Sequence, residues 1–466
     1  MIRSLVRPPQ IAGAGISLLA VFAMLGITAL SGTKTGVALA LAAALGPLAA
    51  YAAICRPFVF PYALFVVLVP FDNLLALDAF GTLTRLIAIA SGGAILLWLI
   101  RTRRAIMPDR AIVYWALLTA WSAATVTWAI DPSASYAHLF TFCQLVGIYA
   151  VVSFVPIDSR MLRFTMAAAI VGGCLASGYG TYVFRQGLDI AGGDRLFLAN
   201  DNSIIDPNQF AAALILPIAL SMVGLIRARS TALRCGCGLA LLIMGGGIAV
   251  SGSRGGLLGV AVALIYVIVR DRKRILGAFI GLAALSAALL FDSNVINRFS
   301  NAASTGGAGR VDIWRVGLSA LRDHFWFGAG ISNFSVAYDQ SFLTVSEHYY
   351  TRWHRAPHNL LLSTSVELGI VGLVILLAAW YFQFRSMRSV PMYGELSGPR
   401  IGVEGALLGL FVAAMFLDVM YTKYIWLAFM LAMMVRNAAV APARTQPQPC
   451  AINSYPIAAP TSPTTS

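Results

Sequence analysis

Long apolar stretches separated by short polar segments make up most of this chain. A membrane-spanning helix needs about 20 predominantly apolar residues, and stretches of that kind recur as far as residue 436. We predict fourteen spans, near residues 11–31, 36–55, 58–77, 83–101, 110–129, 136–155, 162–184, 208–227, 232–250, 255–270, 275–291, 359–384, 402–418 and 420–436. The third, tenth, thirteenth and fourteenth are the weakest, so the predicted class is an all-α membrane protein with about 12–14 transmembrane helices.

The charges between these stretches alternate as the positive-inside rule requires. One alternate set of connections is acidic and carries Asp72, Asp78, Asp131 and a run from Asp189 to Asp206. The other set is basic and carries Arg3, Arg7, Arg56, Arg101, Arg103, Arg104, Arg110, Arg160, Arg163, Arg227, Arg229, Arg234, Arg270, Arg272, Lys273, Arg274, Arg385, Arg388 and Arg436. We therefore expect the basic set and both termini in the cytoplasm. The connection after the eleventh span then lies outside, in the periplasm if the cell is Gram-negative.

The composition agrees with a polytopic membrane protein. Hydrophobic residues make up 59% of the chain and charged residues 11%, with a mean hydropathy of +0.79, whereas soluble proteins carry about 25% charged residues. The net charge of +14 is explained by topology, so no nucleic-acid partner is predicted. The six cysteines form no CxxC pair and fit small buried hydrophobes better than metal or disulfide sites.

Residues 292–358 are the longest polar stretch between spans, and long ordered loops are usually functional. The stretch holds His324, His348, His354 and His358, together with Arg298, Arg310, Arg315, Arg322, Arg352 and Arg355. A second external segment, residues 185–207, contains Arg185 and Arg195. Topology does not explain arginine on the outer side, so we expect another role for these side chains.

These features divide the chain into three parts. Residues 1–207 hold the N-terminal spans and the external loop 185–207, and we interpret the first apolar stretch as a retained span, not a cleaved signal peptide. Residues 208–436 form a core that includes the loop 292–358. Residues 437–466 are rich in Pro, Thr and Ala and predict a disordered cytoplasmic tail.

The motif SGSRGG, residues 251–256, lies at the outer junction of the ninth and tenth spans. Ser253 suits an N-cap. Arg254 would then lie at a helix start, where free backbone N–H groups already favour an anion such as phosphate. The alternative is an interfacial arginine that reaches the lipid headgroups.

Residues 309–324 predict an amphipathic helix that can lie in the membrane surface. Its apolar side consists of Val311, Trp314, Leu318, Leu321 and Phe325, and its polar side of Asp312, Arg315, Ser319 and Arg322. Arg310 precedes the helix and follows a glycine-rich run, which would allow its side chain to extend over a site. The alternative is a plain interfacial helix with solvated arginines, which fits Arg315 and Arg322 better than Arg310.

The sequence RAPHNLL opens the twelfth span and places His358 and Asn359 at the outer surface. A neutral imidazole there can take a proton from a hydroxyl; the alternative is a structural histidine. Glu367 lies inside the span and needs a partner or a water-filled cavity, and packing against another span is the favoured interpretation. In DPNQF, Asp206 suits an N-cap, so we favour a plain helix start over a substrate contact.

Four motifs follow one another along the chain: SGSRGG, GRVDIW from Gly309, FGAGISNF and HNLLLSTSVELGIVG. Together they resemble the O-antigen ligase and polysaccharide polymerase superfamily of bacterial inner membranes. The distinctive part covers residues 200–435, and the earlier spans are similar to the family only in hydropathy.

The resemblance implies a multi-span glycosyltransferase that works on the outer, periplasmic face of the inner membrane. Its donor would be a glycan on undecaprenyl pyrophosphate. Its acceptor would be lipid A core in a ligase or another lipid-linked glycan in a polymerase, with protein as a third variant. The family's reaction is thought to invert the anomeric centre without metal or nucleotide, and no cofactor is predicted. The sequence agrees, since it contains no phosphate-binding loop, HExxH or thiolate set.

The resemblance also assigns roles to residues. His358 matches the histidine that is a candidate general base for the acceptor hydroxyl. Arg310 matches the loop arginine thought to hold the donor pyrophosphate, and Arg254 matches the arginine of the SxSR motif with the same proposed role. Asn359 and Glu367 match further letters of the family motif and, with Arg315, are candidates for supporting roles.

A transporter or flippase for lipid-linked glycans is the alternative from another functional class. Transporters usually place charged residues near the bilayer midplane and often show repeated halves. Here no repeat is visible, and Glu367, Glu404 and Asp418 are the main charged residues within the spans. The basic residues crowd the outer face instead, which favours an enzyme at the membrane surface.

Overall fold

The computed structural model describes residues 46, 49–77, 81–187, 195–200, 203–271, 310–345 and 354–440. The predicted spans near 11–31 and 275–291, and most of the one near 36–55, lie outside these residues. So do Arg298, His348, Arg352 and the tail after residue 440. The predicted all-α class is confirmed, with two short hairpins as the strands of the described part.

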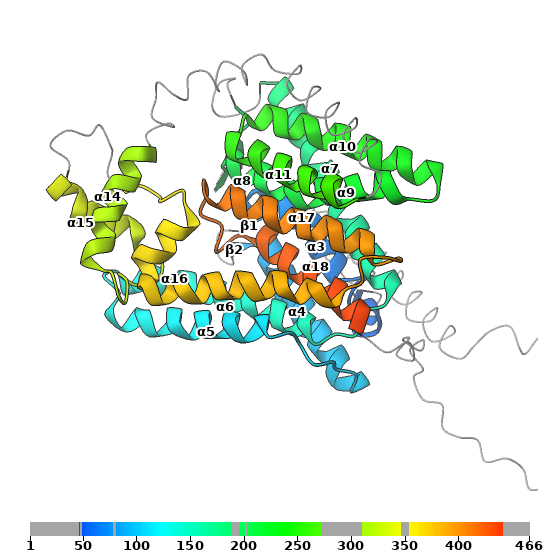
Figure 1. The fold of residues 1–466 in the computed structure, drawn as a ribbon, viewed down its shortest axis with the longest axis horizontal. Helices are drawn as coiled ribbons and strands as arrows, with labels where there is room; N and C mark the ends of the chain where they lie inside the picture. Colours follow the sequence, from blue (N-terminus) through cyan, green and yellow to red (C-terminus); the bar gives the residue numbers. More distant parts are fainter. Residues whose placement is uncertain are drawn as a thin grey trace, which may run out of the picture.

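Most of the long helices run roughly along the long axis of the molecule, whereas α14 (Arg310–Asp323) lies across it (Figure 1). The described part of the chain contains many helices. They are α3 (Tyr62–Leu68), η1 (Val69–Leu75), α4 (Leu83–Thr102), α5 (Ala111–Thr125), η2 (Val126–Trp128), α6 (Pro132–Ser153), α7 (Ser159–Arg185), α8 (Pro207–Ala213), α9 (Ile215–Arg227), α10 (Thr231–Ser251), α11 (Arg254–Arg270), α14 (Arg310–Asp323), α15 (Phe334–Val345), α16 (Leu360–Ser386), η4 (Met387–Ser389), α17 (Ser397–Ala414) and α18 (Lys423–Val440). The strands β1 (Ala76–Leu77) and β2 (Gly81–Thr82) pair antiparallel, as do β3 (Leu198–Asn200) and β4 (Ser203–Ile205).

Eight helical segments within the described residues are long and apolar enough to cross a membrane. They are Leu83–Thr102, Ala111–Trp128, Pro132–Ser153, Ser159–Arg185, Pro207–Arg227, Thr231–Ser251, Leu360–Ser389 and Lys423–Val440. Each coincides with a predicted span to within a few residues. The shorter α11 and α17 coincide with two more. They pack with their backbones close together, because a Cβ added to Gly409 would lie 2.3 Å from the carbonyl oxygen of Gly259.

Two sequence expectations about helix limits are corrected. The predicted span 58–77 is not one helix, because the α-helical part ends at Leu68 and a 3₁₀ segment containing Pro70 follows. Proline removes a backbone donor and disrupts a regular helix. At the C-terminal end, α18 continues to Val440, so the first residues of the predicted tail are helical and Asn437 is buried.

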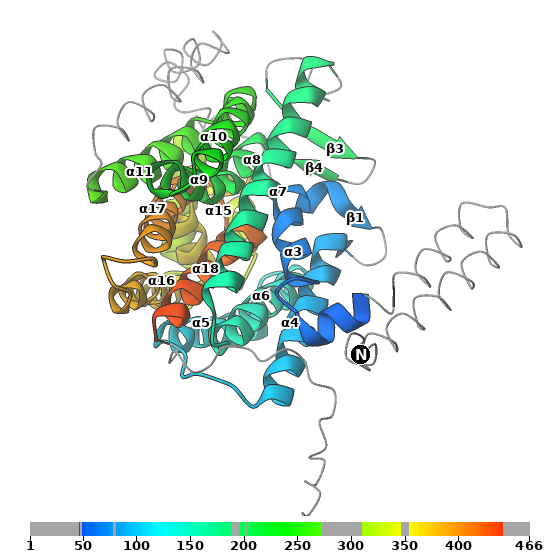
Figure 2. The ribbon, with the colours of Figure 1, turned by 90° about the vertical axis from the view of Figure 1, so that its right-hand side faces the viewer.

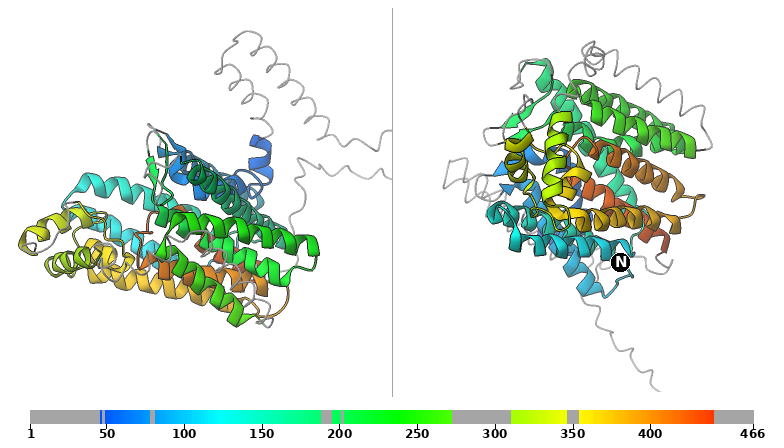
Figure 3. Two further views of the ribbon diagram at one scale, coloured as in Figure 1. Left: turned by 90° about the horizontal axis from the view of Figure 1, so that it is seen from above. Right: turned by 60° about the vertical axis from the view of Figure 1, so that its left-hand side comes forward.

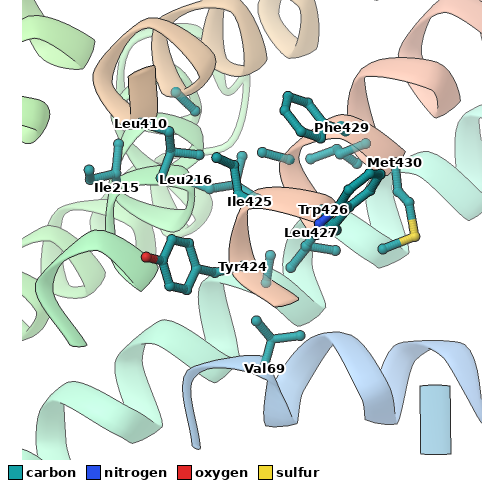
Figure 4. Packing of buried hydrophobic residues seen from close by; sticks show 14 of the residues in the cluster. Val69, Ile215, Leu216, Leu410, Tyr424, Ile425, Trp426, Leu427, Phe429 and Met430 are labelled. Carbon is teal, nitrogen blue, oxygen red and sulfur yellow. The ribbon is translucent and has the colours of Figure 1, made fainter. Parts of the chain in front are cut away.

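The centre of the bundle is built around α18. Seen along the bundle, α18 lies between α16, α17, α6 and α7 (Figure 2). It packs mainly against α6 and α17, and the close view shows its Ile425 beside Leu216 and Leu410 of the same buried cluster (Figure 4). Trp426 is fully buried and its ring lies 4.8 Å from that of Trp115 on α5. Aromatic pairs at this spacing contribute beyond their buried area.

Segments that the charge pattern assigns to one side meet at one end of the bundle. Here α14 and α15 lie together beyond the ends of the other helices (Figure 3), and the N–H of Ile130 donates to the carbonyl of Ala329 (3.1 Å). We call the end of the bundle that carries α14 and α15 the loop end. At the opposite end, Asn437 Nδ2 donates to the carbonyl of Ser153 (3.0 Å). The predicted alternation of the connections therefore agrees with the arrangement of the helices.

The helix α14 forms as predicted, but its buried face is different. Ile313, Val316 and Ala320 face α15 and α16, whereas Val311 and Leu318 of the predicted apolar side are 41% and 54% exposed. The predicted apolar side lies next to the face that packs against α15 and α16. It supplies the apolar surface that a helix in the membrane interface needs.

The helix α16 is kinked where the loop end packs against it. Gly369 has φ 70° and ψ −176°, which only glycine adopts readily. Gly328 in the facing loop has φ 78°, and a Cβ there would lie 2.2 Å from the carbonyl oxygen of Glu367. The two glycines therefore allow two backbones to touch.

Three backbone hydrogen bonds join residues 325–330 to the kink. The N–H of Ala329 donates to Val366 O (2.8 Å), that of Gly330 to Glu367 O (2.9 Å), and that of Ile370 to Phe325 O (2.8 Å). Two indoles add to them, since Trp121 Nε1 donates to Leu368 O (2.8 Å) and Trp128 Nε1 to Gly328 O (3.2 Å). We call this set of contacts the kink junction. It anchors the loop end to a membrane span.

Replacing Gly369 with alanine tests the kink junction. The new Cβ would lie 2.2 Å from the carbonyl oxygen of Trp326 and the backbone would be strained, at a cost of about 1–3 kcal/mol or more. We expect Gly369→Ala to lower the midpoint of thermal unfolding in detergent, measured by tryptophan fluorescence. Gly93→Ala in α4 is the control, because a Cβ there meets nothing within 4 Å. Equal midpoints of thermal unfolding for Gly369→Ala and Gly93→Ala would contradict a structural role for the kink junction.

Candidate functional site

His358, Arg310 and Arg254 come from three separate segments and meet at the loop end. Arg254 is the first residue of α11, Arg310 is the first residue of α14, and His358 precedes α16 by two positions. All three side chains are partly buried. The charges of Arg254 and Arg310 act on each other, and that of Arg310 acts on His358. The structure therefore brings together the three residues that the sequence predicts as the centre of the site.

Phe416 helps to hold Arg310 and α11 together. The Arg310 guanidinium lies 5.8 Å from the centre of the Phe416 ring, a distance at which a cation and an aromatic face attract each other. The same ring packs against the start of α11, where a Cβ added to Gly255 would lie 3.1 Å from Phe416 Cβ. Phe416 thus places Arg310 next to the segment that carries Arg254.

The SGSRGG motif is fixed by its own N-cap and by the start of α8. Ser253 Oγ accepts a hydrogen bond from Gly256 N (3.1 Å), as predicted, and donates to Asn208 Oδ1 (2.9 Å). Arg195 Nη2 donates to the same oxygen (3.0 Å). A Cβ on Gly256 would lie 2.4 Å from Ala211 Cβ, so this glycine is required for α11 to approach α8. Arg195 therefore lies beside the motif.

The backbone at His358 is held in a conformation that few residues adopt. Its φ is 46°, in the left-handed region, where a non-glycine residue costs about 1–2 kcal/mol. The neighbouring contacts offset this cost. Trp314 Nε1 donates to the carbonyl of Pro357 (3.1 Å), and the Asn359 side chain accepts from Leu362 N (3.0 Å) as the N-cap of α16. Asn359 thus supports the site by fixing the residue before it.

His358 is held in its neutral form. Burial lowers its pKa below the usual value, and the positive charges of Arg310 and Arg355 lower it further, while Asp206 acts in the opposite direction. The pKa of Arg310 is also lowered, first by burial and then by Arg254, with Asp206 again opposing. Above its lowered pKa the imidazole is uncharged and can accept a proton.

Two charged residues near His358 were not assigned to the site from the sequence. Asp206 caps α8 as predicted, accepting from Asn208 N (2.6 Å), but its carboxylate also acts on His358 and Arg310. Arg355 precedes His358 by three positions, and its Nε is buried with no hydrogen-bond partner in the described part of the chain. The signal for Arg355 was its nearness to His358 in the sequence, whereas a substrate contact at Asp206 was considered but a plain helix start was favoured.

Glu367 supports the loop from within α16 and belongs to the kink junction. Its Oε2 accepts from Ser332 N (2.9 Å) and from the Tyr421 hydroxyl (3.4 Å), and its Oε1 accepts from Ser363 Oγ (3.3 Å). Packing against another span was the favoured interpretation, but two of these partners lie in the loop end and in the connection between α17 and α18. The partners indicate a structural role.

Arg315 and His354 lie away from the cluster. Arg315 follows Arg310 by five residues, which turns it about 140° round α14, and it forms an exposed ion pair with Asp312 (3.5 Å). Exposed pairs of this kind contribute little to stability. His354 is exposed and forms an ion pair with Asp339, whose carboxylate also accepts from His354 N (2.8 Å). His354 also has a positive φ of 54°.

Comparison with known families agrees with the motifs. Residues 239–377 match the Wzy_C family model, described as O-antigen ligase. No curated protein matches the chain. The predicted resemblance to the O-antigen ligase superfamily is therefore confirmed over this segment, which contains Arg254, Arg310, Arg315, His358, Asn359 and Glu367.

The electrostatic description predicts how the pKa of His358 responds to its neighbours. We expect this pKa to lie below about 6.5, to rise in Arg355→Gln, which removes a positive charge, and to fall further in Asp206→Asn. The measurement is a ¹⁵N-histidine NMR titration in lipid nanodiscs, with His358→Asn identifying the signal. Arg315→Gln is the control and leaves the value unchanged. If the pKa of His358 were the same in both variants as in the wild type, the charged cluster would be contradicted.

The cap at Asn359 predicts a graded response to substitution. Serine can replace asparagine as an N-cap but alanine cannot, and losing a cap costs about 0.5–2 kcal/mol. Asn359→Ala should therefore lower the unfolding midpoint, while Asn359→Ser should retain most of it. If both variants lost glycan transfer equally while melting like the wild type, Asn359 would act in the chemistry and not as a cap.

Proposed function

With residues 239–377 as a segment of the O-antigen ligase family, we propose that this protein is a membrane glycosyltransferase. It moves a glycan from undecaprenyl pyrophosphate to an acceptor hydroxyl. The observation that carries the proposal is the meeting of His358, Arg310 and Arg254 in one partly buried cluster at the loop end. In this proposal the protein lies in the bacterial inner membrane, with the loop end in the periplasm and both termini in the cytoplasm.

The charges of the cluster suit a pyrophosphate. In the described part of the chain, the charges of Arg254 and Asp206 act on Arg310, and those of Arg310, Arg355 and Asp206 act on His358. The mutual repulsion of Arg254 and Arg310 in a partly buried place is relieved when an anion binds between them. Arginine binds phosphate oxygens in a fixed two-pronged geometry, and the starts of α11 and α14 add backbone N–H groups with the same preference. The bound donor adds negative charge next to these arginines.

The reaction follows from this placement. The acceptor hydroxyl gives its proton to the neutral His358 ring as its oxygen bonds to the anomeric carbon. The bond from that carbon to the pyrophosphate oxygen breaks, and its electron pair stays on the pyrophosphate. Arg254 and Arg310 stabilise the negative charge that develops there. Attack on the face opposite the leaving group inverts the anomeric centre.

Donor binding also makes His358 a stronger base. Burial and the positive charges of Arg310 and Arg355 lower the pKa of His358. A pyrophosphate bound to them offsets those charges, so the pKa of His358 rises toward the working pH, where a general base is most effective. The imidazolium that forms is then stabilised by the negative charges of the pyrophosphate and of Asp206. The base is therefore activated only when there is a donor to use.

The acceptor decides which enzyme of this class the protein is. Lipid A core as acceptor makes it a ligase, a second lipid-linked glycan makes it a polymerase, and a protein hydroxyl makes it an oligosaccharyltransferase. The proposed chemistry at His358 and the arginines is the same for all three, because each acceptor presents a hydroxyl to the same base. In this proposal no metal or nucleotide takes part.

Transfer by the purified protein tests the proposal. Protein in nanodiscs receives a lipid-linked glycan and each candidate acceptor, with EDTA and without nucleotide. We expect His358→Asn to slow transfer by about 10²–10⁴-fold and Arg310→Gln by about 10²–10³-fold. Asparagine tolerates the left-handed backbone of His358 better than alanine does, so the variant isolates the loss of the base.

Two controls match these variants. His354→Asn changes a second histidine with a positive φ in the same segment, and Arg315→Gln changes an exposed arginine on the same helix as Arg310. Both should transfer within about threefold of the wild type, as surface substitutions usually do. Transfer by His358→Asn at the wild-type rate would disprove the base assignment. Movement of the lipid-linked glycan across a liposome bilayer without any transfer would favour a transporter.

A further inference from the structure

A cavity of about 170 Å³ lies between η1, α8 and the start of α18. Its polar lining comes from Asp72, Gln209, Tyr421, Lys423 and Tyr424, and Phe210 contributes an apolar wall. The space is far larger than the roughly 10–15 Å³ that one water needs. It is smaller than the roughly 300 Å³ at which sites for drug-sized ligands begin. Its size suits one ring-sized ligand.

The walls of the cavity are electrically balanced. Lys423 Nζ donates to both carboxylate oxygens of Asp72 (2.7 and 2.6 Å), and these two opposite charges offset each other. The hydroxyls of Thr82 and Thr84 also donate to Asp72 Oδ1 (2.7 and 2.6 Å). The described lining residues therefore offer no net charge to a phosphate or a metal ion. A neutral ligand with many hydroxyl groups meets both a carboxylate and an ammonium group.

The remaining polar groups can make further hydrogen bonds. Gln209 Oε1 accepts from the Tyr424 hydroxyl (2.5 Å) and its Nε2 donates to Asp418 O (2.8 Å). An amide carries two N–H donors and two acceptor lone pairs, and a phenol oxygen can also accept. Among the residues that the structure describes, the Gln209 amide therefore keeps one donor and one acceptor for a ligand. Hydroxyl-binding groups beside the apolar lining residues Val69, Pro70 and Phe210 match a sugar, which presents hydroxyls at its edge and C–H groups on its face.

The start of α8 connects the cavity with the charged cluster. The Asp206 carboxylate acts on His358 and Arg310 in the cluster and on Tyr424 in the cavity lining. Gln209, which lines the cavity, follows Asp206 by three residues on the same helix. A glycan whose reacting end lies at His358 can therefore extend toward the cavity.

We infer that this cavity binds one neutral sugar ring of a glycan substrate, next to the reacting end. The inference rests on the proposed transferase function and adds a specificity subsite to it. The ring can belong to the donor glycan or to a glycan acceptor, because both present the same hydroxyl chemistry. The two sources are separated by experiment.

Two variants remove the subsite in different ways. Ala213→Leu fills the cavity from α8, and Gln209→Met keeps the side-chain length but removes the amide. Gln144→Met is the matched control, because Gln144 accepts from Arg85 Nε (2.8 Å) on other helices and does not line the cavity. Unfolding midpoints identify the variants that fold, and Gln209→Met carries the test if Ala213→Leu is destabilised by overpacking.

Binding is measured separately for three ligands: the lipid-linked glycan, glycan-free undecaprenyl pyrophosphate and the acceptor. We expect both variants to bind one glycan-bearing ligand about tenfold more weakly, as the loss of one or two hydrogen bonds implies. Undecaprenyl pyrophosphate should bind as it does to the wild type. A loss confined to the lipid-linked glycan assigns the ring to the donor, and a loss confined to the acceptor assigns it to the acceptor.

Unchanged binding of both glycan-bearing ligands in a folded variant would overturn the inference and leave a cavity that holds water only. Equal weakening for glycan-free undecaprenyl pyrophosphate would also overturn it, because the effect would then not depend on sugar. These binding results do not require turnover. A wild-type protein that transfers nothing would refute the proposed function without deciding the fate of the subsite.

Discussion

The kink junction is the constraint on which the rest of the loop end depends. A long polar segment outside a membrane loses much conformational freedom when it is ordered, and here part of that cost is offset by backbone pairing with a span. Gly369 and Gly328 let the two chains touch, and the buried Glu367 carboxylate accepts from Ser332 N on the same loop. The start of α16, and with it His358, is thereby fixed relative to α14 and Arg310.

The second organising feature is charge held in a partly buried place. Burial and Arg254 lower the pKa of Arg310, and burial together with the positive charges of Arg310 and Arg355 keeps His358 neutral. In the proposed reaction the substrate offsets these positive charges, so binding and activation of the base share one electrostatic cause. The anion is expected at the starts of α11 and α14, where backbone N–H groups are unpaired within the helix.

Much of the fold could be predicted because it depends on local pattern. Apolar length located the spans, and alternating charge grouped their connections, since both reflect the membrane as a solvent. The break after Leu68 was missed because hydropathy does not register a change of helix type. The buried side of α14 was misassigned, since Val311 and Leu318 are apolar yet face away from α15. In a membrane interface, apolar character does not separate a packed face from a lipid-facing one.

The candidate site was predicted in part. The motifs identified His358, Arg310 and Arg254, because each stands at a recognisable helix start. The nearness of Asp206 to them could not be predicted, since it depends on how α8 packs against α11 through Gly256. The hydrogen-bond partners of Glu367 could not be predicted either, because they come from segments that are far apart in the sequence.

A structure of the protein with bound undecaprenyl pyrophosphate would test the central claim most directly. The account predicts pyrophosphate oxygens within hydrogen-bond distance of the Arg254 and Arg310 guanidinium groups, with the His358 ring beside the terminal phosphate. A pyrophosphate bound at the opposite end of the bundle, near Arg227 and Arg234, would contradict it.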